Sequence, residues 1–197
     1  ISRNKKVYKD TISKLESLRG NKTELIYCDH HLSHLAYSYY TSPFTESALL
    51  SVDGVGEWDT ATIGSGRSNN IEILKSLQFP HSLGLLYSAF TYFTGFRVNS
   101  GEYKLMGLAP YGQPKYKDVI LDELLDVKDD GSFAMDMSFF NYCQGLTMTN
   151  KRFAQLFGGP ARSSESDITE REMDLAASVQ AVTEEIVFRM ARYARDV

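Results

Sequence analysis

The stretch ESALLSVDGVGEWDTATIGSG, residues 46–66, predicts a β-hairpin. Its two β-rich runs, ESALLSVD and TATIGSG, are separated by Gly54, Gly56 and a few polar residues, so the tip is expected to be unusually rich in glycine. A third strand candidate, residues 70–79, follows directly. The sequence therefore predicts three consecutive strands in the first half of the chain.

The segment before the hairpin predicts a helix, a short strand and a second helix. Residues 5–19 have a helical pattern that stops at Gly20 and Asn21, and residues 23–28 have the composition of a short strand. That strand leads into CDHHLSHLAYSYYTSPF, residues 28–44, which contains three of the four histidines. The order of these elements indicates a β–α step.

The segment after the hairpin is expected to supply the apolar core. SLGLLYSAFTYFTGF, residues 82–96, predicts a buried helix whose aromatic rings belong to the core rather than to a cofactor site. Residues 115–126 predict another helix, and the turn-rich residues 129–160 predict a hairpin and a short helix. The buried positions expected in the first of these helices are Leu83, Leu86, Phe90 and Phe93.

The last helix has the strongest pattern in the chain. Thr169 and Glu172 form a capping box, and apolar residues then recur on one face. This stripe consists of Leu175, Val179, Val182, Ile186, Met190 and Ala194. Neither an internal repeat nor a low-complexity linker interrupts the sequence, so no domain boundary is visible within residues 1–197.

The composition describes a globular chain with no sign of polyanion binding. With 197 residues and 43% hydrophobic composition, it can bury the core of one ordinary domain. Its 21 basic and 25 acidic residues leave a net charge of −4 without long runs of one sign, which argues against nucleic acid and anionic membranes. Cys28 and Cys143 cannot form a disulfide framework, and no apolar run approaches the roughly 20 residues of a membrane span. A reducing cytoplasm is the expected location, and both ends of the sequence resemble cuts within a longer protein.

Helical geometry separates the three histidines of residues 28–44. With about 3.6 residues per turn, His30 and His34 lie one above the other, whereas His31 is turned roughly 100° away. Stacked imidazoles can present two nitrogen ligands to one metal ion, and the alternative is a polar helix start with partly exposed histidines. A zinc-protease motif would need glutamate directly after the first histidine, where this chain has His31.

Asp53 is expected at the end of the first hairpin strand, beside Gly54 and Gly56. An ordinary Asp-Gly turn explains this carboxylate by itself, but glycine also allows close approach of a phosphate or a metal-bound ligand. Together with His30 and His34, Asp53 would form a set of two histidines and one carboxylate. Such a set leaves coordination positions open, as catalytic metal sites do.

The segment NSGEYKLMGLAPYG, residues 99–112, predicts a helix start that carries Glu102 and Lys104. Backbone N–H groups and an ammonium group converge there, which suits an anionic group such as phosphate. The spacing is not that of a P-loop, and a solvated helix start is the alternative. His81, in FPHSLG, is either a neighbour of a helix N-cap or a site residue.

Three motifs occur in order along the chain: DHHLSH (29–34), VDGVGEWDTATI (52–63) and FPHSLGLLYSAFTYFTGFRVNSGEYKLMGLAPYG (79–112). Together they resemble the carbamoyltransferase family that includes nodulation protein U and the antibiotic O-carbamoyltransferases, relatives of the tRNA threonylcarbamoyl-transfer enzymes. DLAASVQAVTEEIV, residues 174–187, resembles the helix that follows in that family. The resemblance covers residues 25–190.

This resemblance implies an α/β fold. It would be an actin-like ATPase lobe of the ribonuclease-H-like type, with a mixed sheet flanked by helices, and residues 1–197 would be an incomplete, internal part of that N-terminal domain. The implied metal ligands are His30, His34 and Asp53, with a further aspartate ligand beyond residue 197. The implied metal is divalent, with iron as the first expectation and zinc or magnesium as alternatives.

The implied activity is carbamoyl transfer. A carbamoyl group from carbamoyl phosphate would pass, through a carbamoyl adenylate made with ATP, to a hydroxyl of a small-molecule or saccharide acceptor. Gly54, Gly56, Glu102 and Lys104 would position the nucleotide or the donor, and no catalytic residue is assigned. The isolated chain is expected to be inactive, and a homo-oligomer is compatible with it. A non-enzymatic metal-binding or interaction domain is the alternative reading of the same ligands.

Overall fold

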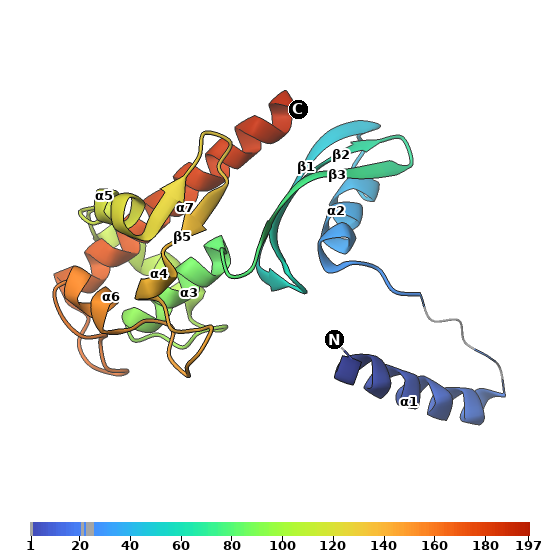
Figure 1. Ribbon diagram of the computed structural model, residues 1–197, viewed down its shortest axis with the longest axis horizontal. Coiled ribbons are helices and arrows are strands. Elements are labelled where there is room, and N and C mark those ends of the chain that lie inside the picture. The colour runs from blue at the N-terminus through green and yellow to red at the C-terminus, as the bar shows by residue number, and fades with distance from the viewer. Residues whose placement is uncertain (1, 21, 23–25) are drawn as a thin grey trace.

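The computed structural model describes residues 2–20, 22 and 26–197 (Figure 1). The α-helices are α1 (Ser2–Arg19), α2 (His30–Tyr40), α3 (Leu83–Phe93), α4 (Glu102–Leu108), α5 (Lys117–Val119), α6 (Lys151–Leu156) and α7 (Glu170–Asp196). The strands are β1 (Glu46–Gly56), β2 (Asp59–Arg67), β3 (Asn70–Gln78), β4 (Leu125–Val127) and β5 (Phe133–Met135). Short turns of other helix types are η1 (Ala109–Tyr111), the π-helical η2 (Ile120–Leu124) and η3 (Met137–Phe139).

The predicted hairpin is present and belongs to an antiparallel sheet in the order β1–β2–β3. Leu50 lies opposite Ile63, and Ile63 lies opposite Lys75, so β2 is the central strand. The prediction of a mixed sheet is wrong for the described residues, in which both sheets are antiparallel. Short turns join these strands, whereas a parallel pair needs a crossover connection of about a dozen residues or more.

The glycines of the hairpin lie in β1 and not at its tip. β1 continues to Gly56, and the turn is made by Glu57 and Trp58, with Glu57 at a positive φ of 64°. The pairing of β1 with β2 shifts register between Val52 and Gly56, so Asp53 lies in a bulge of the strand rather than at its end. Bulges re-aim side chains, and this one directs the Asp53 carboxylate toward α2.

Helices cover both faces of the three-stranded sheet (Figure 1). Thr62 and Gly64 of β2 face α2, and Gly64 lies against Leu35 of that helix. Ala61 and Ile63 point to the opposite face, as strand geometry requires, and pack into the main core. The sheet therefore connects the helix that carries the histidines to the helical part of the molecule that contains α3 and α7.

The predicted buried helix and the C-terminal helix form the main core. All four expected core positions of α3 are almost fully buried, and so is the apolar stripe of α7 along its whole length. Phe90 packs edge-on against Phe153 and Phe157, with ring centroids 5.2 and 5.3 Å apart. Thr169 and Glu172 form the predicted capping box. Both helix predictions are confirmed.

The segment between α4 and α7 agrees with the predictions in part. The helix predicted over 115–126 is limited to α5 and η2, because residues 125–127 leave the helical path and pair with β5. α6 confirms the short helix expected in this turn-rich region. The expected hairpin is displaced, because β5 lies within residues 129–160 whereas β4 lies wholly before them.

The N-terminal predictions also differ in outcome. The helix expected over 5–19 lies within α1 and is confirmed. The strand expected over 23–28 includes residues 23–25, which lie outside the described residues, while residues 26–28 form no strand. Among the helices of the described ranges, none combines the length and hydropathy that crossing a bilayer requires.

Candidate metal centre

α2 presents two stripes of side chains that are offset by one residue. His31, Leu35 and Tyr39 recur every fourth position and are buried against the sheet. One position earlier in each turn, a second stripe lines a surface pocket of about 520 Å³ beside β1: His30, His34 and Ser38. The expectation that His30 and His34 share a face, and that His31 faces elsewhere, is confirmed.

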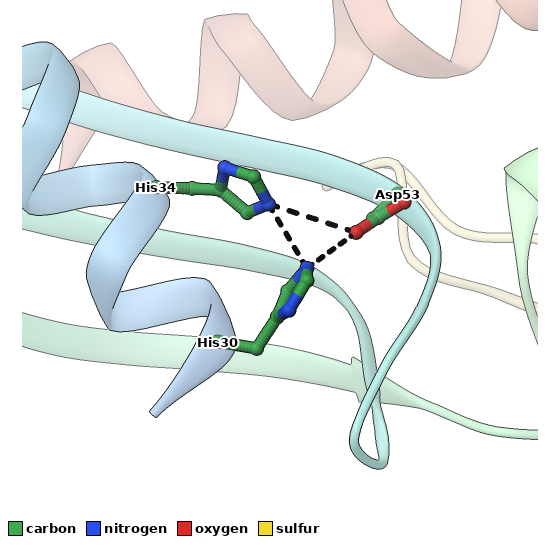
Figure 2. Close-up of side chains that lie close together, drawn as sticks. All are labelled: His30, His34 and Asp53. Carbon is green, nitrogen blue, oxygen red and sulfur yellow. Dashed lines mark hydrogen bonds and ion pairs between the residues drawn. The ribbon is translucent and has the colours of Figure 1, made fainter. Parts of the chain in front are cut away.

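His30, His34 and Asp53 come together in this pocket (Figure 2). His30 Nε2 lies 2.8 Å from Asp53 Oδ2 and 2.9 Å from His34 Nε2, and His34 Nε2 lies 3.7 Å from Asp53 Oδ2. The three side chains are between 36% and 55% exposed, so their ligand atoms are accessible to an incoming group. The structure thus brings together, from α2 and β1, the three residues that the sequence suggests as metal ligands.

The donor atoms of this cluster suit a shared cation better than hydrogen bonds among themselves. An imidazole Nε2 carries either one hydrogen or one lone pair, so His30 cannot donate fully to Asp53 and also accept from His34. A divalent cation would engage both imidazoles and the carboxylate at once. Ligands of a tetrahedral ion with bonds of about 2.0–2.1 Å are about 3.3 Å apart, close to the spacing found here. Two nitrogens and one carboxylate suit iron or zinc more than magnesium, which prefers oxygen ligands.

Backbone contacts hold Asp53 in place for this role. The Gly54 N–H donates to Asp53 Oδ1 at 2.6 Å, which leaves Oδ2 for the histidines. Partial burial raises the pKa of Asp53, but the hydrogen bonds from Gly54 and His30 outweigh this effect and hold the pKa below its ordinary value. The carboxylate is therefore ionised at neutral pH, as a metal ligand must be.

The start of α3 supports the bulge that carries Asp53. Ser82 is the N-cap of α3, and its hydroxyl accepts from the Leu85 N–H at 3.0 Å and donates to the Gly54 carbonyl at 2.6 Å. Gly84 approaches so closely that a Cβ there would lie 2.7 Å from the Asp53 carbonyl oxygen. The sequence alone points to neither contact, although the preference of N-caps for serine is a signal that identifies Ser82.

Residues 3–196 match the family described as carbamoyltransferase N-terminus. The chain belongs to this family. It is 58% identical to the uncharacterized protein sll1178 of Synechocystis sp., over 94% of this chain and 31% of that protein. It is 28% identical to nodulation protein NolNO of Sinorhizobium fredii, over 89% of this chain and 24% of that protein. It is also 28% identical to nodulation protein NolO of Bradyrhizobium diazoefficiens, over 85% of this chain and 28% of that protein. The chain therefore spans less than a third of the length of these relatives, and the family resemblance of its motifs is confirmed.

Gly56 of this carbamoyltransferase N-terminal chain leaves room for the His30 ring. A Cβ at Gly56 would lie 2.2 Å from His30 Cδ2 and 2.7 Å from His31 Cδ2. We expect Gly56→Ala to displace His30 and to weaken divalent metal binding about tenfold or more. Gly54→Ala is the control, because a Cβ there meets no atom within 4 Å. Metal titration of both variants measures the effect, and equal affinities would show that the His30 ring does not need this space.

Glu102 folds back onto the start of its own helix. Its carboxylate accepts from Ser88 Oγ at 2.8 Å, from the Asn99 N–H at 2.9 Å and from the Gly101 N–H at 3.1 Å. Burial raises the pKa of Glu102, but these hydrogen bonds outweigh it and the pKa is lowered. Glu102 therefore fixes the turn before α4, in which Asn99 has a positive φ of 66°.

The residues expected to bind the nucleotide or donor fall into two groups. Gly54 and Gly56 adjoin the histidine cluster, whereas no hydrogen bond or ion pair within the described ranges joins Glu102 or the exposed Lys104 to it. The two roles considered for His81 can also be compared. It precedes the N-cap of α3, and its Nδ1 accepts from a backbone N–H of β5 at 3.0 Å, so its contacts are those of an N-cap neighbour.

Proposed function

We propose that the protein to which this chain belongs is a metal-dependent O-carbamoyltransferase. It would hydrolyse carbamoyl phosphate to carbamate and phosphate, join the carbamate to ATP as carbamoyl adenylate with release of pyrophosphate, and transfer the carbamoyl group to a hydroxyl of a small-molecule or saccharide acceptor with release of AMP. The observation that carries this proposal is the convergence of His30, His34 and Asp53 in a chain of the carbamoyltransferase N-terminal family.

In this proposal the three clustered residues hold a divalent metal, with iron as the first expectation and zinc or magnesium as alternatives. A metal bound there supplies Lewis-acid chemistry toward a phosphate or carbonyl oxygen. His30, His34 and Asp53 would supply three of the ligands and a further aspartate beyond residue 197 another, and an ion that takes more than four ligands would keep positions for water or substrate. An exchangeable coordination position beside these ligands would favour a catalytic site, and a closed four-ligand site would favour a non-enzymatic interaction domain.

Other residues of the chain would bind and orient the donor. Ser38 and Ser51 line the pocket beside the cluster and offer hydroxyl groups. Gly54 faces open space where a side chain would be, which leaves room for a phosphate against the β1 backbone. We assign four residues to nucleotide or donor binding: Gly54, Gly56, Glu102 and Lys104. In that set Lys104 supplies positive charge, and Glu102 holds the turn beside it.

We further propose an actin-like ATPase fold of two ribonuclease-H-like lobes, of which residues 1–197 are an internal part. Three consecutive strands, β1–β2–β3, with helices on both faces support this assignment, while the mixed pairing expected of the whole lobe is absent from the described residues. The active site of such a fold lies between lobes, so the open side of the pocket would face the remainder of the protein. A cytoplasmic location is part of the proposal and is supported by the exposed free thiols of Cys28 and Cys143. A homo-oligomer is also part of the proposal.

Metal analysis combined with a turnover assay tests the proposal in the full-length protein. The purified protein should contain one divalent metal, and repeated turnover of carbamoyl phosphate should require both ATP and a hydroxyl acceptor. Removing the metal should abolish turnover, and adding it back should restore turnover. A tightly held metal together with no ATP-dependent consumption of carbamoyl phosphate would instead support the non-enzymatic alternative.

Lys104→Ala tests the donor-binding assignment in the full-length protein. Loss of the ammonium group should lower kcat/KM for ATP or carbamoyl phosphate at least about tenfold, a loss of roughly 1.4 kcal/mol of transition-state stabilisation. Lys151→Ala, at the exposed start of α6, removes a comparable charge elsewhere and should leave kcat/KM unchanged. Wild-type kinetics in the Lys104 variant would assign this residue to the solvated surface of α4.

A further inference from the structure

The first turn of α2, which carries His30, has a single buried anchor. The buried side chains of α2 are His31, Leu35 and Tyr39, and the last two pack together with Leu49 in a small apolar cluster. Residues 26–29, which precede the helix, are exposed, and the N-cap residue makes no side-chain capping bond. His31 is therefore the one buried side chain of α2 that fixes the turn on which His30 stands.

His31 contacts the sheet through a directional bond rather than through packing alone. Its Nδ1 lies 2.9 Å from Thr62 Oγ1, and both side chains are almost fully buried. Thr62 is on β2 and lies opposite Ser51 of β1, two residues before Asp53. The bond thus joins the first turn of α2, which carries His30, to β2. The neighbouring strand β1 carries Asp53.

The choice of histidine at this buried position calls for an explanation beyond apolar burial. The Nε2 of His31 is buried and has no hydrogen-bond partner among the described residues, which is unfavourable for a polar atom. A leucine paired with a valine in place of Thr62 would fill similar space without that cost. A hydrogen bond, however, fixes the distance and angle between helix and strand, whereas apolar contacts tolerate sliding.

We propose that His31 and Thr62 form a positioning pair, which holds the first turn of α2 so that His30 meets His34 and Asp53 around one metal ion. This inference rests on the metal binding of the proposed function. His31 is not a ligand in it, because its ring lies on the buried stripe of α2 and its Nδ1 is engaged with Thr62. The pair acts through the orientation of α2, as residues that support metal ligands commonly do.

Substitutions at Thr62 test the pair without altering α2 itself. Thr62→Val keeps the shape and removes the hydroxyl, and Thr62→Ser keeps the hydroxyl. Co²⁺ binding to the full-length protein, prepared without metal, is followed by the visible absorption of the bound ion, and thermal unfolding is measured without metal. Thr62→Val should weaken Co²⁺ binding about tenfold and change the absorption spectrum, while Thr62→Ser should stay within about twofold of the unsubstituted chain. Thr62→Val also leaves the buried His31 Nδ1 without its partner and should lower the unfolding temperature, so the changed absorption spectrum is the readout that a loss of stability alone would not produce.

A second pair of variants probes the same bond from the other side. The amide of His31→Asn can occupy the place of Nδ1, so this variant should bind Co²⁺ within about threefold of the unsubstituted chain, and His31→Leu should lose about tenfold. Equal affinity in the unsubstituted chain, Thr62→Val and His31→Leu would overturn the inference alone. Loss of affinity only in proportion to loss of stability would also overturn it. Failure of the unsubstituted full-length protein to bind any divalent metal would overturn the proposed function as well.

Discussion

Replacing Asp53 by asparagine is expected to weaken divalent metal binding by more than about 100-fold, beyond the range typical of residues that only support a ligand. The substitution keeps the shape of the side chain but removes its charge, so the two imidazoles of His30 and His34 remain without an anionic partner. The Gly54 N–H can still be satisfied by the amide oxygen, so the bulge in β1 should persist. Isothermal titration with Zn²⁺ or Co²⁺ measures the loss.

Two comparisons make this result specific. Asp59→Asn removes a carboxylate from the facing strand, where it accepts from Gln78 Nε2 at 3.1 Å, and should leave metal affinity almost unchanged. His30→Ala should weaken metal binding about as much as Asp53→Asn does. His31→Ala should weaken it less, because the His31 ring is buried against the sheet and does not line the pocket. Equal losses in the two histidine variants would contradict the assignment of His31 to a supporting role.

The histidine stripe could be predicted because helical periodicity is a local property. Once residues 30–40 form a helix, the spacing of four residues places His30 above His34 whatever the rest of the molecule does. The same rule places His31 with Leu35 and Tyr39, and the structure buries all three. No information about distant segments is needed for either result.

The position of Asp53 could be predicted only in part, because it depends on residues far along the chain. The hairpin pattern locates the strand, but the bulge between Val52 and Gly56 is held by the start of α3. Ser82 Oγ donates to the Gly54 carbonyl at 2.6 Å, across 28 positions of sequence. A pattern of alternating residues carries no signal for such a contact, so the expected strand end became an irregular continuation of β1.

The helix predicted over 115–126 failed at its end for a similar reason. Apolar residues at 120, 121, 124 and 125 suit a helix, but Leu125 and Val127 also alternate as a strand does. Residues 125–127 form a strand because they pair with residues 133–135. The turn between the two strands contains Gly131, which has a positive φ of 82°. The competing partner lies outside any local window, so periodicity alone could not choose.

Gly112 follows η1 at the point where the chain meets the start of α7. A Cβ at this position would lie 2.0 Å from the Met173 carbonyl oxygen and 2.6 Å from the Asp174 backbone nitrogen. Both atoms belong to the backbone of a capped helix and cannot move aside as a flexible side chain can. The next residue is held to the same helix, since the Gln113 N–H donates to Asp174 Oδ1 at 2.7 Å. The segment therefore has no free direction in which to relax.

Gly112→Ala should accordingly destabilise the chain by about 3 kcal/mol or more, at the upper end of overpacking effects. For a domain of this size, the expected fall in Tm is roughly 6–12 °C. Gly107→Ala provides the comparison, because a Cβ there meets no atom within 4 Å and alanine in α4 should add about 0.5 kcal/mol of stability. Thermal unfolding of the two variants and the unsubstituted chain measures both effects. A Gly112 variant with unchanged Tm would contradict the close approach to α7, and with it the fixed position of the α4–η1 segment that presents Lys104.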